Sequence, residues 1–167
     1  MGRKHLMAHS DERVAMFNPK GEVVFEQPLE GDGPSVVEMF QIEGTLFSCF
    51  VRGDIVTVYR ESAYAGTFRI ESDAAEVPVD FTGNFEPLEL IFNQGLEPKL
   101  LLTAKVGTDS NGKNMISVFD IDFTELKSEF VSKATVGNFA GTSRTKSNVI
   151  FHVDEAKAQS FAFNPLS

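Results

Sequence analysis

Two carboxylates near residue 120 are the simplest candidates for chemistry in this sequence. Asp120 and Asp122 lie two residues apart within the apolar stretch 115–122, which is expected to form a β-strand. Because side chains alternate between the two faces of a strand, both carboxylates should project to the same face. Such a pair could share a cation or a proton. Carboxylates at strand ends more commonly bind turn amides or water, and we prefer that structural interpretation.

The polar link before this strand has the composition of a calcium-binding loop but not its spacing. Asp109, Asn111 and Asn114 supply oxygen ligands within residues 107–114. The EF-hand pattern requires a glycine at the sixth position and a glutamate at the twelfth, whereas glycine here is fourth and aspartate twelfth. The Asn-Gly pair in this link favours a hairpin turn. We therefore expect a turn whose polar residues are available to a binding partner.

The single cysteine and the three histidines form no recognisable catalytic or metal-binding motif. Cys49 lies between apolar residues on one face of an expected strand, where a thiol acts as a small apolar filler. His5 and His9 lie near the N-terminus, and His152 alternates with apolar residues in another strand. Nucleophile-elbow, phosphate-loop and dinucleotide-binding motifs are also missing from the sequence. We expect no catalytic residue, no metal and no cofactor.

One stretch near the C-terminus is locally basic in an otherwise acidic chain. Arg144 and Lys146 lie within residues 135–147, which are rich in Gly, Ser, Thr and Asn and are expected to form an exposed, mobile loop. These two cations could receive an acidic partner or a phosphate, although a solvated loop is the ordinary interpretation. The net charge of −9 argues against nucleic acid as a partner, because its phosphates are bound by clustered cations.

Chain length and composition favour one domain in a reducing compartment. The chain has 167 residues and one cysteine, which excludes an intramolecular disulfide and favours a cytoplasmic location. No stretch approaches the ~20 consecutive apolar residues that span a bilayer, so no membrane partner is expected. Residues 1–11 are polar and are expected to form a flexible N-terminal arm. Residues 12–167 are expected to form a single all-β domain.

Alternating apolar stretches separated by turn residues predict an antiparallel all-β fold. Residues 36–71 show this most clearly and predict a four-strand meander, with strands at 36–42, 45–51, 55–60 and 67–72. The second of these stretches is apolar on both faces, so it should lie between two packed layers. Further strands are expected at 13–17, 22–26, 77–81, 88–92, 99–106, 115–122, 127–134, 148–153 and 159–163.

Several of these strands end in an aromatic residue followed by a polar one: Phe17-Asn18, Tyr59-Arg60, Phe119-Asp120 and Phe151-His152. The run at 116–121 resembles the end of the third strand of a WD-type β-propeller blade, with Phe119-Asp120 where that family has Trp-Asp. The strand order and length of residues 36–71 are similar to those of one blade, about 40–45 residues. The resemblance implies about four propeller-like blades, either a small ring or an open fragment completed by another chain.

A β-sandwich or β-barrel is the alternative, because hairpin-rich sheets also produce strands with aromatic ends. The aromatic positions 17, 59, 119 and 151 are irregularly spaced, at 42, 60 and 32 residues. The preferred function is a non-catalytic protein-binding or scaffold module, in which unpaired strand edges also make homo-oligomerisation an expectation. A ligand-binding barrel or carbohydrate-binding sandwich is the second hypothesis. An enzyme that uses the carboxylate pair is the third.

Overall fold

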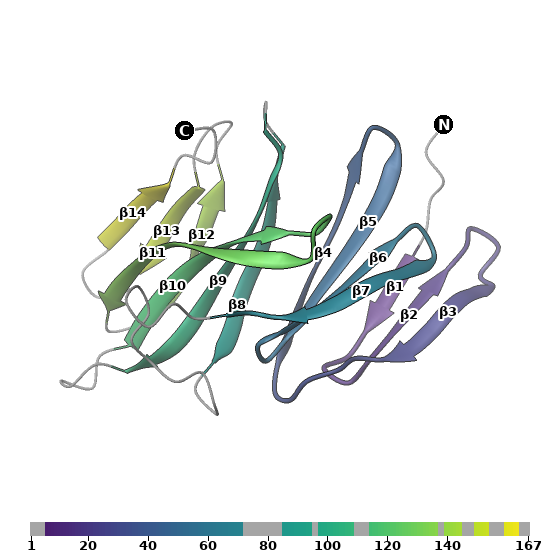
Figure 1. Cartoon of the computed structure of the whole chain (residues 1–167), viewed down its shortest axis with the longest axis horizontal. Helices are drawn as coiled ribbons and strands as arrows, with labels where there is room; N and C mark the ends of the chain where they lie inside the picture. The colour runs from purple at the N-terminus through teal and green to yellow at the C-terminus, as the bar shows by residue number, and fades with distance from the viewer. Residues whose placement is uncertain are drawn as a thin grey trace.

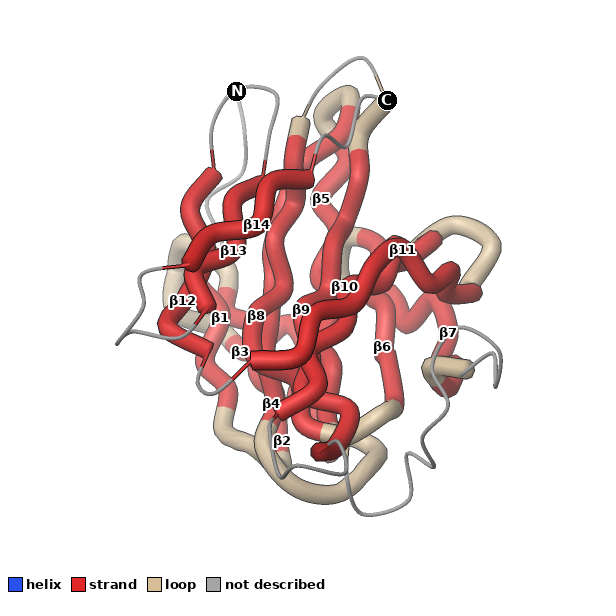
Figure 2. The backbone as a smooth tube through the Cα atoms, turned by 90° about the vertical axis from the view of Figure 1, so that its left-hand side faces the viewer, coloured by secondary structure: helices blue, strands red, loops and turns tan. Residues whose placement is uncertain are grey.

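A computed structural model of the chain describes residues 6–71, 85–94, 97–108, 114–136, 139–144, 149–153 and 159–163. Strands and connecting loops make up the whole of this described part, as Figure 2 shows. The strands are β1 (Leu6–His9), β2 (Arg13–Phe17), β3 (Val23–Pro28), β4 (Ser35–Ile42), β5 (Thr45–Arg52), β6 (Ile55–Arg60), β7 (Ala63–Arg69), β8 (Glu86–Asn93), β9 (Lys99–Thr108), β10 (Asn114–Asp122), β11 (Lys127–Val136), β12 (Phe139–Arg144), β13 (Val149–Val153) and β14 (Gln159–Phe163).

The strands form four antiparallel sheets that lie side by side (Figure 1). The N-terminal sheet contains β1 to β3, the second sheet β4 to β7, the third sheet β8 to β11, and the C-terminal sheet β12 to β14. Neighbours in each sheet are consecutive in the chain, so every sheet is a meander, and none of the described sheets closes on itself. The predicted all-β class with four-strand meanders is therefore confirmed. Among the described residues, no helix is long and apolar enough to cross a membrane.

The second sheet is apolar on both faces because it packs against a neighbour on each side. Cys49 and Val51 of β5 belong to a core shared with the third sheet, whereas Leu46 and Phe50 of the same strand belong to a core shared with the N-terminal sheet. The prediction that this strand lies between two packed layers is confirmed. Alternate side chains of one strand thus supply two separate cores.

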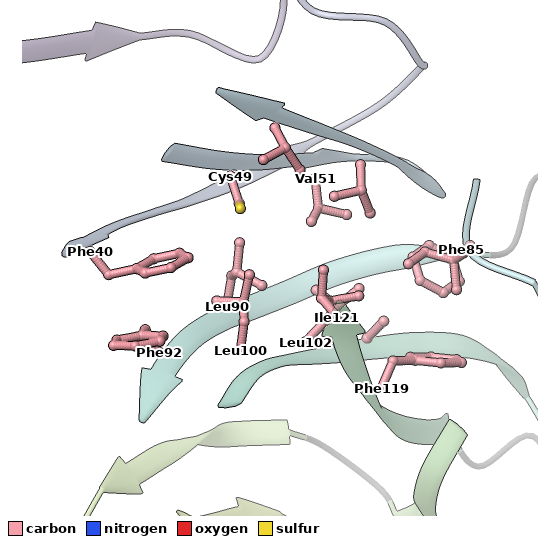
Figure 3. Close-up of a cluster of buried hydrophobic side chains, with 14 of the residues drawn as sticks. Phe40, Cys49, Val51, Phe85, Leu90, Phe92, Leu100, Leu102, Phe119 and Ile121 are labelled. Atoms are coloured by element: carbon pink, nitrogen blue, oxygen red, sulfur yellow. The ribbon is translucent and has the colours of Figure 1, made fainter. Parts of the chain in front are cut away.

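The core between the second and third sheets is built from aliphatic side chains and phenylalanine rings (Figure 3). Phe40 of β4 stacks on Phe92 of β8, with ring centroids 4.2 Å apart. Beside this pair, the backbone N–H of Phe92 donates a hydrogen bond to the Glu38 carboxylate at 3.3 Å. The first strand of each sheet is therefore tied to the other by stacking and by a hydrogen bond.

The core between the N-terminal and second sheets centres on Tyr59. Its ring stacks on Phe25 of β3 at 4.5 Å and meets Phe50 of β5 edge-on at 5.8 Å. The Tyr59 hydroxyl donates a hydrogen bond of 2.7 Å to Gln27 Oε1. The buried phenol therefore has a polar partner, as a tyrosine in a core requires.

The buried environment of the Tyr59 phenol predicts that the folded protein loses stability at alkaline pH. Burial raises the pKa of the Tyr59 phenol above its ordinary value of 10.0, and neighbouring Tyr64 and Glu30 act in the same direction. Because the unfolded chain ionises first, the stability from this group is fully present below pH 10.0 and is lost as the pH rises through the folded pKa. In a Tyr64→Phe variant, which retains one tyrosine, phenolate absorbance should therefore develop above pH 10.0. Ionisation at or below that pH would contradict the buried setting.

Three local expectations are wrong. Residues 6–9 are not part of an arm, because they form β1 and pair with β2 from Leu6↔Phe17 to His9↔Val14. Residues 139–144, expected within a mobile loop, form β12 and pair with β13. The link before β7 is a two-residue turn with Glu61 at φ 53°, so β7 begins at residue 63 and not at 67.

All three segments were missed for the same reason. They are short or rich in small residues, so apolar and polar side chains do not clearly alternate along them. β1 has only four residues, and two of them, Met7 and His9, contact the core of the N-terminal and second sheets. The strand expected at residues 77–81 lies outside the described residues.

Candidate functional site

The predicted carboxylate pair lines a groove at one end of the third sheet. Its volume is about 350 Å³, and its charged and hydroxyl lining is supplied by Lys99, Asp120, Asp122, Thr124, Lys127, Ser128 and Glu129. Asp120 pairs with Glu129 and Asp122 with Lys127 across β10 and β11, so these four side chains project to one face of the sheet. The predicted common face of the two carboxylates is confirmed.

Asp120 is engaged in an ion pair. Lys99 Nζ donates a hydrogen bond of 2.9 Å to Asp120 Oδ2 across β9 and β10, and both side chains are partly buried. This hydrogen bond raises the pKa of Lys99, with the negative charges of Asp120, Glu97 and Glu129 adding to it and burial opposing it. Lys99 is therefore held as a cation beside Asp120.

Asp122 caps the turn between β10 and β11. Its Oδ1 accepts hydrogen bonds from the backbone N–H of Thr124 at 3.0 Å and of Glu125 at 2.8 Å. The backbone carbonyl of Asp122 accepts a further bond from Leu126, which has a φ of 59°. The structural interpretation, in which such a carboxylate binds turn amides, is confirmed for Asp122. Residues 123–126 form the turn between these two strands.

Of the other predicted binding residues, the structure describes Asn114 and Arg144. Asp109, Asn111 and Lys146 lie outside the described residues. Asn114 begins β10 of the third sheet, where it pairs with residues 108 and 136. Arg144 ends β12 of the C-terminal sheet, where it pairs with residue 149. The two described positions therefore belong to different sheets.

Cys49 is fully buried in the core between the second and third sheets. Burial raises the pKa of its thiol strongly, and the nearby Glu38 carboxylate adds to the effect. Because the thiolate is the reactive form, Cys49 acts as the apolar filler that its position in the sequence indicated. In the part of the chain that the structure describes, no three His, Cys, Asp or Glu side chains gather to hold a metal ion.

The structure also shows an apolar surface that the sequence did not reveal. On the outer face of the N-terminal sheet, Leu6 pairs with Phe17, and Phe17 pairs with Val23. Leu6 is 68% exposed, Val23 is 55% exposed and Phe17 is partly buried. We call these three residues the apolar row. Recognising β1 as a strand would have been needed to find it, because the row exists only when three strands are aligned.

The fold and these surfaces define an all-β protein of packed antiparallel meanders. No family model matches the chain, and no curated protein matches it. Among solved structures, it is similar to a protein of unknown function from Bacteroides caccae, whose crystal structure was determined at 1.35 Å resolution. The two are 9% identical, the match covers 98% of this chain and 90% of the other, and the TM-score is 0.24.

Proposed function

We propose that this protein is a non-catalytic binding or scaffold module that presents the outer face of its N-terminal sheet to a protein partner. The observation that carries this proposal is the apolar row, exposed at one end of a series of sheets. The second sheet, in contrast, has apolar side chains covered on both of its faces. We also propose a cytoplasmic location. A single free cysteine supports it, because thiols stay reduced in that compartment.

The apolar row could supply the anchoring residues of a protein-binding surface. Covering one large apolar side chain completely stabilises a complex by about 1.5–3 kcal/mol, so a few such residues can dominate binding. Arg13 and Glu26 lie on the same face, further along β2 and β3, where their side chains pair at 3.5 Å and remain exposed. An apolar centre with a polar rim is the usual anatomy of an interface.

We also propose that the sheets are arranged like propeller blades. Contacts join the first strands of the second, third and C-terminal sheets: β4 contacts β8, and β8 contacts β12. Convergence of first strands is what an arrangement of blades around an axis requires. In such an arrangement the two outermost sheets would each keep one face for a partner.

A pair of substitutions on the apolar row tests the proposed function. The double variant Leu6→Ser/Val23→Thr should lose partner capture at least about tenfold, because apolar area is removed from the interface centre. Tyr64→Gln, which alters an exposed apolar residue on the second sheet, should retain it. The measurement is quantitative recovery of co-purified proteins from cell extract, together with light scattering of the purified protein. A monomer that recovers no protein, or equal recovery by all three proteins, would refute the proposal.

A further inference from the structure

The groove at the end of the third sheet carries more negative than positive charge. Its charged lining consists of three carboxylates and two ammonium groups, those of Asp120, Asp122, Glu129, Lys99 and Lys127. Lys127 Nζ lies 2.7 Å from the carboxylate of Glu125, a residue outside the lining, so its charge is met there. Because a concave site concentrates the field of the charges that line it, the remaining negative charge attracts a cation.

Glu129 is the carboxylate that is open to a ligand. It lies directly opposite Asp120 across β10 and β11, and like charges in that position destabilise a sheet. The Lys99 ammonium neutralises only one charge of this pair. The ion pairs between described residues do not include Glu129, which is exposed. A second cation beside Glu129 would therefore remove a repulsion that the fold leaves in place.

Lys99 shows which kind of cation this face of the sheet accepts. Its Nζ donates to Asp120 Oδ2 at 2.9 Å within the groove, and both side chains are partly buried. An ammonium group is compact and carries several N–H donors, so it can bond to neighbouring carboxylates at once. A second ammonium group between Asp120 and Glu129 would repeat the contact of Lys99, and positive and negative charges would then alternate along the groove.

A metal ion suits these carboxylates less well. Calcium and magnesium ions are coordinated by about six or more oxygen atoms at short distances. In the part of the chain that the structure describes, no three His, Cys, Asp or Glu side chains come close enough together to hold a metal ion. Asp122 Oδ1 is also engaged by the backbone N–H groups of Thr124 and Glu125. An ammonium group needs only the two facing carboxylates.

We propose that this groove binds a primary alkylammonium ion, with its charged head between Asp120 and Glu129 and its carbon chain against the apolar part of the lining. That part is supplied by Pro98, Ile121 and Phe123. The volume of about 350 Å³ is at the small end of the range for ligand sites, which suits one short chain. A free amine and the lysine side chain of a partner protein both present this chemistry. The site belongs to the third sheet and is separate from the apolar row.

Titration of the ¹⁵N-labelled full chain with n-butylammonium chloride, followed by NMR, tests the proposal. Ionic strength is held constant with NaCl, so that general screening does not change. We expect saturable shifts of the amide signals of residues 99 and 120–129, with a Kd of about 1–10 mM for so small a ligand. The control probe is n-butanol, which has the same carbon chain without the charge and should give no saturable shifts.

Three variants relate binding to the charges of the groove. Glu129→Gln should weaken butylammonium binding at least about tenfold, because it removes one of the two facing carboxylates. Glu26→Gln neutralises an exposed strand carboxylate of the N-terminal sheet and should change binding less than about twofold. Lys99→Gln should tighten binding at least about threefold, because it frees Asp120 and removes a competing cation. The dispersion of the amide spectrum shows for each variant that it is folded.

A second probe identifies the source of the ammonium group. A Gly-Lys-Gly tripeptide with blocked ends that binds at least as tightly as butylammonium indicates a lysine side chain, whereas weaker binding indicates a free amine. No saturable binding of either probe, or equal binding of n-butanol, would overturn the proposal. Binding that Glu129→Gln leaves unchanged, or that Lys99→Gln weakens, would also overturn it. Tighter binding of Ca²⁺ that depends on Glu129 would replace it with a metal site.

Discussion

Phe50→Ala is expected to lower the free energy of unfolding by about 3–5 kcal/mol, the usual cost of truncating a buried phenylalanine. Phe50 is 1% exposed and lies between the Tyr59 ring of its own sheet and the His9 ring of β1. The cavity would open between two β-sheets, which cannot close it without moving as units. Domains of this size are stable by about 5–15 kcal/mol, so the loss is a large share of the total.

Urea unfolding followed by far-ultraviolet circular dichroism measures this loss. Val23→Ala is the matched control, because it also truncates an apolar side chain but at a residue that is 55% exposed. It should change stability by less than about 0.5 kcal/mol. A Phe50→Ala loss below about 1 kcal/mol would mean that the N-terminal sheet does not depend on this core.

The architecture could be predicted where strands are long and turns are short. Alternation in residues 36–60 identified β4, β5 and β6, and the two apolar faces of β5 indicated its central position. β1 could not be predicted, because four residues are too few for a pattern. Its described contacts are tertiary: it pairs with β2, and its His9 ring meets Phe50 across the core. Local alternation thus predicts a strand, whereas only tertiary packing stabilises a short one.

The candidate sites also differ in whether local sequence or tertiary packing determines them. The common face of Asp120 and Asp122 follows from their spacing alone and was predictable. Their chemical state was not, because Lys99 approaches Asp120 from the neighbouring strand. The apolar row depends on the register of three strands, which one sequence does not specify. The shared face of the carboxylates is therefore a feature of local sequence, while the groove and the apolar row are features of the assembled fold.

Gly31→Ala is expected to destabilise the protein by about 3 kcal/mol, because it combines backbone strain with a backbone clash. Gly31 has a φ of 108°, and a Cβ at this position would lie 2.5 Å from the carbonyl oxygen of Arg52. The oxygen cannot retreat easily, since Arg52 is also bound to the same loop through its guanidinium. Its Nη1 donates to the Leu29 carbonyl at 3.0 Å, and its Nε donates to the Gly33 carbonyl at 3.2 Å.

Gly33→Ala in the same loop separates the two contributions. Gly33 also has a positive φ, 84°, but a Cβ there would have no atom within 4 Å. It should therefore cost only the conformational strain, about 1 kcal/mol. Chemical unfolding of both variants measures the difference, which we expect to be about 2 kcal/mol and assign to the clash with Arg52. Equal losses would show that the loop is not held against β5. The loop joins β3 to β4, so that result would also remove one restraint on how the N-terminal sheet lies over the second sheet.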